Sequence, residues 1–207
     1  MKTFLRITAA VAMATACMAA TAQSAGTWSV RLGATRIDPQ TSSGWLSTPS
    51  FPDTRVDVKA NSQLTGGVTY MVTNNWAIDV PMGLPFKHDF VGNGAISGTG
   101  KLGRTKVLPA TVFAQYRFGE ANSAFRPYLG LGVTYAKFFG ERTTASVDSK
   151  WGLTPQIGFV YNFNERWFLD VAYYKSFLKT TAHLSSGQSV SLKLNPNVYA
   201  IGIGYRF

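Results

Sequence analysis

The chain has 207 residues, of which 14% carry a charge and 14% are aromatic. Because soluble domains usually carry about 25% charged residues, this composition argues against a protein whose whole surface faces water. The formal net charge is +10, but the basic residues are scattered singly among aromatic residues and glycines, which argues against the clustered basic stripe of a nucleic-acid-binding protein.

The first residues have the pattern of a secretory signal peptide. Lys2 and Arg6 give a positively charged start, the apolar stretch 7–20 is too short to span a bilayer, and an A-x-A cleavage site ends at Ala22. We therefore expect residues 1–22 to be removed and residues 23–207 to form a single domain.

The single cysteine, Cys17, lies in the predicted signal peptide. The mature chain would then fold without disulfides, as an exported protein can. A lipoprotein site at Cys17 is the alternative, but Ala14 stands where such sites usually have a larger aliphatic residue.

Eight segments follow in which bulky apolar residues alternate with small or polar ones. In the last of them Tyr199, Ile201 and Ile203 fall on one set of alternate positions, and Gly202 and Gly204 fall on the other. Because a strand sends alternate side chains to opposite faces, each segment has one apolar face. The predicted strands, in chain order, are 28–35, 64–72, 76–84, 108–118, 127–135, 153–162, 167–174 and 197–207.

The small and polar faces of these strands cannot form a dry core, because they would leave voids and unpaired polar groups. A closed barrel in a membrane avoids this problem, since closure pairs every backbone group and the apolar face contacts lipid. We therefore predict an all-β fold, an eight-stranded antiparallel transmembrane β-barrel of the outer membrane. A soluble lipocalin-like barrel is the alternative, but it would carry more charge on its outer face.

The connections between the predicted strands are of two lengths. Those at 73–75, 119–124 and 164–166 are short, whereas those near 37–60, 87–105 and 139–150 are long. Short turns are typical of the periplasmic end of such barrels, and long loops are typical of the extracellular end. Aromatic residues gather beside the short turns, as in an interfacial girdle: Trp76, Phe118, Tyr161, Phe163, Trp167 and Phe207.

Several short motifs follow one another along the mature chain. They are Leu-Pro-Phe-Lys-His at 84–88, Leu-Pro-Ala-Thr at 108–111, Phe-Arg-Pro-Tyr-Leu-Gly-Leu-Gly at 125–132 and Gly-Tyr-Arg-Phe at 204–207. Together they resemble the OmpW family of outer-membrane proteins. The resemblance implies a Gram-negative outer-membrane barrel that passes small, mainly hydrophobic molecules. It also implies that Tyr205 and Phe207 belong to a C-terminal signal for the outer-membrane assembly machinery.

An eight-stranded barrel has room for packed side chains or for one small ligand. We expect a hydrophobic solute to enter a narrow channel from the loop end and to leave sideways into the bilayer, without passing through water. Pro81, Pro85 and Pro109 lie near the loop end, where missing backbone donors either loosen the wall or mark ordinary strand ends. Phe86 and Phe138 either close the mouth or anchor at the outer interface.

Two features leave a choice open. Trp151 resembles the position at which this family narrows its lumen, but strict alternation from Ile157 puts it on the lipid face. Pro155 often marks a bulge, which would shift the alternation before it. The inward glycines either open local space or relieve crowding between strands.

Enzymatic chemistry has little support in the sequence. Only His88 and His183 titrate near neutral pH, and Asp89 points to the opposite face of a strand from His88. A lipid-modifying barrel would depend on His88. Because no nucleophile, phosphate-binding or metal-binding motif is found, we expect no catalytic site, no cofactor and no metal.

A structural or surface-interaction barrel is the other alternative. Long loops that carry Trp45 and Phe51 would dock a phage, a bacteriocin or a host factor. Basic residues near the outer rim would suit lipopolysaccharide phosphates: Lys87, Lys101, Arg104, Lys106, Lys137 and Arg142. The expected partners are outer-membrane lipids, lipopolysaccharide, small hydrophobic solutes and the assembly machinery, with no nucleic acid.

Overall fold

The computed structural model describes residues 23–40, 42–43, 54–98, 100–140, 145–184 and 189–207. The predicted signal peptide lies outside these ranges, as do Trp45, Phe51 and Arg142. Within the described ranges, no helix is long and apolar enough to cross a membrane.

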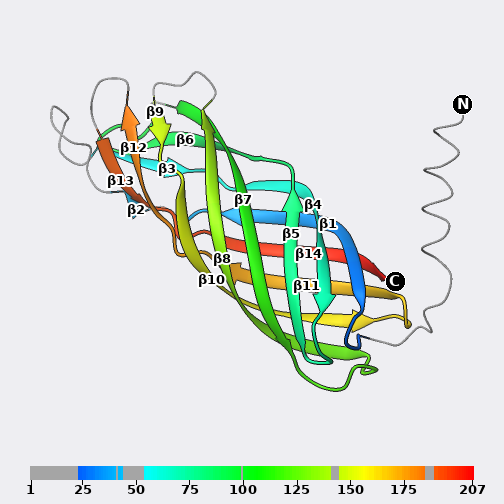
Figure 1. The fold of residues 1–207 in the computed structure, drawn as a ribbon. Coiled ribbons are helices and arrows are strands. Elements are labelled where there is room, and N and C mark those ends of the chain that lie inside the picture. The colour runs from blue at the N-terminus through cyan, green and yellow to red at the C-terminus, as the bar shows by residue number, and fades with distance from the viewer. Residues whose placement is uncertain (1–22, 41, 44–53, 99, 141–144, 185–188) are drawn as a thin grey trace, which may run out of the picture.

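Eight antiparallel strands form the wall of a barrel (Figure 1). They are β1 (Trp28–Asp38), β4 (Asn61–Met71), β5 (Trp76–Gly83), β7 (Lys101–Arg117), β8 (Phe125–Gly140), β10 (Lys150–Asn162), β11 (Trp167–Lys175) and β14 (Asn197–Arg206). From β1 the ring runs through β4, β5 and β7 on one side and through β14, β11, β10 and β8 on the other. Pairing of β7 with β8 closes it. The predicted eight-stranded barrel is confirmed, and each predicted strand overlaps one of these.

The alternation of bulky and small residues decides which face of each strand points outward. On β14, Ile201 and Ile203 are 55% and 53% exposed, whereas Gly202 and Gly204 are buried. The register places Ile203 between Leu32 of β1 and Leu169 of β11, so bulky side chains form continuous rows around the barrel. This is the surface that faces hydrocarbon in an outer-membrane barrel.

The aromatic girdle beside the short turns is also confirmed. All six predicted members are exposed, and Trp28 joins them at the start of β1. The rings of Trp167 and Tyr205 lie 5.1 Å apart, and those of Tyr205 and Phe207 lie 5.3 Å apart, in edge-to-face arrangements. The C-terminus and the short turns therefore mark the periplasmic end of the wall.

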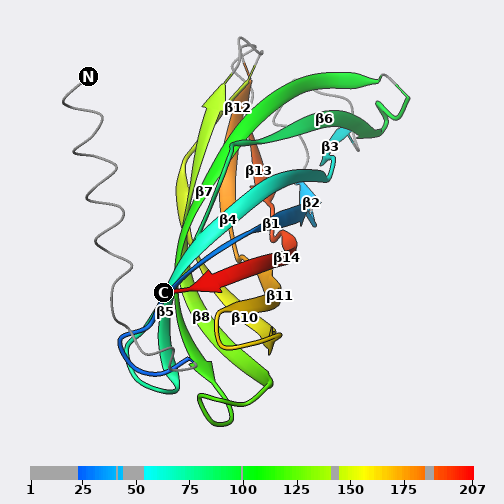
Figure 2. The same ribbon diagram turned by 90° about the vertical axis from the view of Figure 1, so that its right-hand side faces the viewer.

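Further strands extend the barrel at the opposite end (Figures 1 and 2). They are β2 (Ser42–Ser43), β3 (Thr54–Val58), β6 (Phe86–Gly94), β9 (Ala145–Val147), β12 (Lys179–Leu184) and β13 (Ser189–Lys193). β3 and β6 continue the wall beside β7, while β2, β13, β12 and β9 form a separate four-stranded sheet. Strands thus occupy part of the connections expected as long loops, and the connection from β11 to β14 carries a hairpin that the sequence analysis did not single out.

Inward-facing glycines make room for rings on neighbouring strands. A Cβ atom on Gly158 would lie 2.5 Å from the ring of Tyr128, and one on Gly204 would collide with the ring of Phe168. Both rings are buried in the lumen. Of the two alternatives for the glycines, relief of crowding therefore holds at these positions.

Candidate functional site

The extracellular half of the lumen is an apolar pocket. Its wall includes a cluster of buried side chains that come from six strands or connections: Ile37, Phe86, Val107, Ala136, Leu178 and Val198. The pocket is open to the outside, and most of its lining is apolar. Such a lining suits a small apolar molecule, because burial in it removes hydrocarbon from water without a polar partner.

A layer of hydroxyl groups lies below the apolar wall. Thr134 links Thr111 and Thr154, with oxygen–oxygen distances of 2.8 Å and 2.6 Å, and Thr154 donates to Ser176 at 3.0 Å. These hydroxyls bond to one another, so their desolvation is compensated within the protein. The layer is uncharged and forms a transition from the apolar pocket to the charged half of the lumen.

Two aromatic rings meet at the lower end of the apolar pocket, and we call them its floor. Phe113 on β7 is fully buried, and its ring meets that of Tyr174 on β11 edge to face, with 5.3 Å between centroids. Gly132 on β8 lies beside Phe113, where a Cβ atom would come within 2.5 Å of the ring. The glycine therefore lets Phe113 lie across the lumen.

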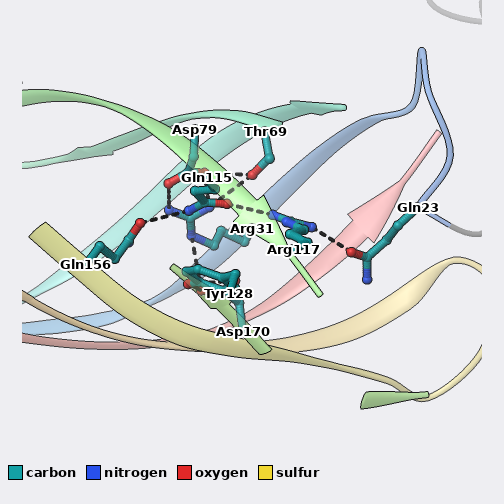
Figure 3. Close-up of polar contacts among 9 residues, drawn as sticks. All are labelled: Gln23, Arg31, Thr69, Asp79, Gln115, Arg117, Tyr128, Gln156 and Asp170. Atoms are coloured by element: carbon teal, nitrogen blue, oxygen red, sulfur yellow. Dashed lines mark hydrogen bonds and ion pairs between the residues drawn. The ribbon is translucent and has the colours of Figure 1, made fainter. Parts of the chain in front are cut away.

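A charged cluster fills the lumen on the periplasmic side of this floor (Figure 3). The guanidinium of Arg31 makes a bidentate ion pair with Asp79, with Nη2 2.8 Å from Oδ2, and the Thr69 hydroxyl donates to the same carboxylate at 2.6 Å. Asp170 lies 4.0 Å from Arg31 and accepts a hydrogen bond of 3.3 Å from the Tyr128 hydroxyl. The carboxylates are buried but paired, which is the condition for charge in a low-dielectric interior.

Amide and guanidinium groups continue this cluster to the short turns. Arg117 donates to the side-chain carbonyls of Gln23 at 2.8 Å and Gln115 at 3.0 Å, and Gln115 in turn donates to Gln156 at 3.0 Å. Arg126 donates to the backbone carbonyl of Gln23 at 3.2 Å. Gln23, which precedes β1, thus joins Arg117 of β7 and Arg126 of β8 across the lumen, while Gln115 and Gln156 join β7 to β10.

The wall of the apolar pocket has a gap between β5 and β7. These strands pair only at 76–79 and 113–116, and farther out β7 pairs with β6 at 101–107. Between the two ladders, no ladder pair joins 80–85 to 108–112, although the structure describes both segments. At about 3.3 Å per residue, the five unpaired residues of β7 make this gap roughly 17 Å long.

The pocket extends into this gap. Its lining includes Met82 and Leu84 of the β5 side, which are 52% and 63% exposed on the outer surface, together with the buried Phe86. Leu108 and Pro109 line it from the β7 side. One apolar space therefore contacts both the lumen and the lipid-facing surface.

Comparison with known proteins identifies the family. Residues 24–207 match the model of the OmpW family. The chain belongs to the OmpW family. It is similar to outer membrane protein W of Vibrio cholerae, with 36% identity over 197 residues that cover 88% of this chain and 89% of the relative. A more distant relative is the dibenzothiophene metabolism operon protein PahQ of Pseudomonas aeruginosa, with 26% identity over 188 residues, 87% of this chain and 88% of the relative.

The fold of this OmpW-family chain is similar to that of a solved outer-membrane protein. The crystal structure of OprG from Pseudomonas aeruginosa matches it with a TM-score of 0.82 and 31% identity, over 90% of this chain and 98% of that one. The OmpW-family barrel described above is therefore a protein of the Gram-negative outer membrane.

The three prolines named from the sequence all lie in the gap. Pro81 and Pro85 fall in the unpaired segment 80–85, and Pro109 falls in 108–112. On their other sides Pro81 pairs with Gly67 and Pro109 with Ala136, so the wall is intact there. Because proline has no N–H, these positions cannot donate a bond across the gap.

The two phenylalanines named from the sequence both line the pocket. Phe86 is buried in its wall, and Phe138 packs against the same cluster. The next residue, Phe139, points outward instead, and the ammonium of Lys137 lies 5.3 Å from its ring centroid. Of these two adjacent phenylalanines, Phe138 lines the pocket and Phe139 lies on the outer surface.

Trp151 lies on the outer surface of the barrel, not in the pocket. It is 69% exposed, and its ring lies 4.7 Å from that of Tyr135 on β8. The ladder between β10 and β8 passes Pro155, opposite Leu131, without a bulge, so the alternation that starts at Ile157 holds. The lipid-facing alternative is the observed one, and Trp151 does not line the apolar pocket.

His88 is buried beside the pocket, and Lys87 and Asp89 on either side of it point outward, beyond the lipid-facing rows. Nδ1 of His88 donates to the backbone carbonyl of Lys59 at 2.8 Å. Burial lowers the pKa of the imidazole below its ordinary 6.5, although the bond to Lys59 and the charge of Asp89 oppose this shift. His88 is therefore neutral at pH 7, as a residue of an apolar wall should be.

The sequence analysis missed the charged cluster. This cluster joins Arg31, Asp79 and Asp170, which lie on three different strands. The signal in the sequence was that several of the few charged residues occupy inward positions of the predicted strands. Residues within the described ranges offer no group of three or more histidine, cysteine, aspartate or glutamate side chains that would bind a metal.

Proposed function

We propose that this OmpW-family barrel carries small apolar molecules from the cell exterior into the outer membrane. A solute would enter the apolar pocket at the extracellular end and leave sideways through the gap between β5 and β7. The observation that supports this proposal is the continuity of the pocket from the buried Phe86 to the lipid-exposed Leu84.

A lateral exit is favoured by the cost of the alternative. Moving an apolar solute into water costs about 0.8 kcal/mol per CH₂ group, or roughly 6 kcal/mol for a chain of eight carbons. An axial exit would require this cost and would also disrupt the buried pair of Arg31 and Asp79, which costs about 3–5 kcal/mol when one partner is lost. Passage from pocket to hydrocarbon requires neither.

The name of one relative is consistent with an apolar cargo. PahQ is named as a dibenzothiophene metabolism operon protein, and dibenzothiophene is an apolar fused-ring compound. We extend this class of cargo to the present chain because its pocket wall is apolar and its hydroxyl groups bond to one another.

Uptake into vesicles with lipopolysaccharide in the outer leaflet tests the proposal, because that leaflet slows direct entry of apolar molecules. Arrival of 1-bromooctane is measured by quenching of a pyrene-labelled lipid, and entry of a size-matched polyol is measured by vesicle swelling. The protein should accelerate only the bromoalkane. Equal acceleration of both would contradict the proposal.

Two adjacent phenylalanines provide a matched control. Phe138→Gln places an amide in the pocket, whereas Phe139→Gln makes the same change on the outer surface. We expect the first to slow bromooctane delivery about tenfold, since an unpaired amide in an apolar site costs about 1–3 kcal/mol, and the second to leave it unchanged. Equal rates in the two variants would count against the pocket as the route.

We further propose that Tyr205 and Phe207 form part of the signal read by the assembly machinery. Phe207 is 60% exposed at the periplasmic end, and its ring contacts that of Tyr205. Such rings remain accessible on the outer face of the last strand. Phe207→Ala should slow insertion by the purified machinery without changing the folded barrel's unfolding midpoint, and an unchanged insertion rate would contradict the proposal.

A further inference from the structure

One side chain of the apolar pocket has a hydrogen-bonding atom that the protein itself does not use. His88 follows Phe86 by two positions on β6, so both side chains point to the lumen, and both line the pocket. Their rings lie nearly parallel, with 6.4 Å between centroids and 17° between planes. Nδ1 of His88 bonds to the Lys59 carbonyl, but Nε2 makes no hydrogen bond to any residue that the structure describes.

The bond to Lys59 decides which nitrogen of His88 carries the hydrogen atom. A carbonyl oxygen can only accept, so Nδ1 must be the N–H donor. Burial lowers the pKa of the imidazole, and the ring is therefore neutral at pH 7. In a neutral ring with its hydrogen on Nδ1, Nε2 has a lone pair and no hydrogen. Nε2 is thus an acceptor that cannot donate.

The hydroxyl groups of the pocket do not have this one-sided character. Tyr174 presents a hydroxyl-bearing ring at the floor. A hydroxyl both donates and accepts, so it can bond to an ether as well as to an alcohol. The threonine and serine hydroxyls of the lining all bond to other hydroxyls: Thr35, Thr65, Thr111, Thr134 and Ser176. Among the side chains that line the pocket, His88 therefore distinguishes an alcohol from an ether.

The wall continues from His88 toward the gap with apolar side chains. Phe86 and Val107 belong to the buried cluster, and Met82 and Leu84 line the pocket at the gap. A solute whose polar end lies at His88 thus has apolar surroundings along the rest of its length. An alkane in this position leaves Nε2 without a donor, whereas a primary alcohol supplies one hydrogen and needs no further polar group.

We propose that the pocket prefers aliphatic alcohols to alkanes and ethers of the same size, with the solute hydroxyl donating to Nε2 of His88. One bond satisfies the nitrogen and the hydroxyl hydrogen together, while the alkyl chain lies along the apolar wall toward the gap. An alcohol held in this way leaves through the gap with its chain first. As a preference among transported molecules the proposal rests on the route proposed above, but the binding can be measured alone.

Nitrogen-15 NMR of the full mature chain in detergent tests the acceptor directly. The sequence has two histidines, His88 and His183, so in a sample with labelled histidine His183→Phe leaves only the signals of His88. At neutral pH the free protein should show a protonated Nδ1 and an unprotonated Nε2, and 1-octanol should shift the Nε2 resonance until the site is saturated. A hydrogen on Nε2 in the free protein, or an Nε2 resonance that octanol does not shift, would overturn the proposal.

A pair of isomers measures the preference. Heptyl methyl ether has the same atoms as 1-octanol but no O–H group, and saturation transfer from the protein to the protons of each ligand gives both affinities. At equal concentrations in the micelles, octanol should bind about tenfold more tightly, the usual worth of one hydrogen bond. Equal affinity for the two isomers would contradict the proposal, and this result requires no variant.

Substitution assigns the preference to His88. His88→Phe keeps an aromatic ring and removes the acceptor, so the ratio of the two affinities should fall to about one, the value expected without the hydrogen bond. His183→Phe makes the same change on β12 and should keep the tenfold ratio of the native chain. Far-UV circular dichroism verifies that both variants fold. A preference that survives in folded His88→Phe would assign it to the backbone carbonyls of the gap and overturn the role of His88.

Bromooctane delivery to vesicles by the native chain separates this inference from the transport route. If the protein delivers bromooctane but binds octanol and the ether equally, the role of His88 is wrong and the route stands. If the protein prefers octanol but delivers no bromooctane, the pocket binds alcohols as inferred and the route is wrong.

Discussion

Joining the two sides of the gap should block delivery of apolar molecules. If the ladder between Asp79 and Phe113 is continued across the gap, Met82 falls opposite Ala110. Both side chains point outward and are exposed, so Met82→Cys with Ala110→Cys accepts thiol cross-linkers of graded length. The chain has one cysteine, Cys17 in the predicted signal peptide, and the mature protein would offer no competing thiol.

The size of the effect follows from the routes that remain after cross-linking. A solute of eight carbons that cannot leave sideways must return through water, at a cost of about 0.8 kcal/mol per CH₂ group and roughly 6 kcal/mol in total. Each 1.4 kcal/mol changes a rate about tenfold, so delivery should fall by roughly four orders of magnitude, which in practice is the rate of vesicles without protein. An axial route would have to pass the rings of Phe113 and Tyr174, which meet edge to face.

The assay is bromooctane delivery to lipopolysaccharide-containing vesicles before and after cross-linking, followed by reductive release of a cleavable linker. Short linkers should block delivery, and release should restore it. Leu32→Cys with Ile203→Cys is the control, because these exposed residues are partners in the intact ladder between β1 and β14. Undiminished delivery through a barrel with quantitatively bridged β5 and β7 would refute the lateral route.

Three further predictions concern the lumen. Asp79→Asn leaves the Arg31 guanidinium with a weakened buried pair and should lower the free energy of unfolding by about 3–5 kcal/mol in urea titrations; an unchanged midpoint would show that the pair is dispensable. Gly204→Ala should cost about 1–3 kcal/mol through overpacking against Phe168, and this cost should be smaller when Phe168→Ala is already present, whereas simple additivity would argue against the clash. The pKa of His88 in the folded protein lies below 6.5, so its contribution to the free energy of unfolding is complete above pH 6.5 and is lost as the pH falls toward the folded pKa. His88→Gln should therefore flatten the fall in the free energy of unfolding below pH 6.5. An identical slope in the variant would contradict the assignment.

The wall of the barrel could be predicted because its pattern is local. Every wall strand alternates bulky and small residues, as Ile201 and Gly202 do on β14, and one face of the sheet is uniformly apolar. Lipid imposes this contrast on each strand separately. The alternation also gave the correct orientation of Trp151, which the sequence left open only because Pro155 can mark a bulge.

The extracellular strands and the charged cluster were harder to predict because they depend on contacts between distant segments. β12 and β13 lie beyond the lipid-facing rows, where no apolar surroundings impose strict alternation. The cluster requires the register of the barrel, since Arg31 reaches Asp79 from another strand, 48 positions away in sequence. The sequence of a single strand shows which ionisable residues stand at inward positions, but it does not show which of them contact one another.

The gap between β5 and β7 was hard to predict for the same reason, because it depends on how separate strands pair. The sequence pointed to Pro81, Pro85 and Pro109 as missing donors near the loop end, and the structure places all three in the segments between the two ladders. The cause of the gap is that β7 changes partner from β5 to β6, and a change of partner has no signature in a single strand.

A structure of the protein with 1-bromooctane, with bromine positions located by anomalous scattering, tests the lateral path most directly. Bromine should appear in the apolar pocket beside Phe86 and Phe138 and continue into the gap beside Met82 and Leu84. Bromine below the floor, among Arg31, Asp79 and Asp170 and leading toward the short turns, would contradict lateral exit.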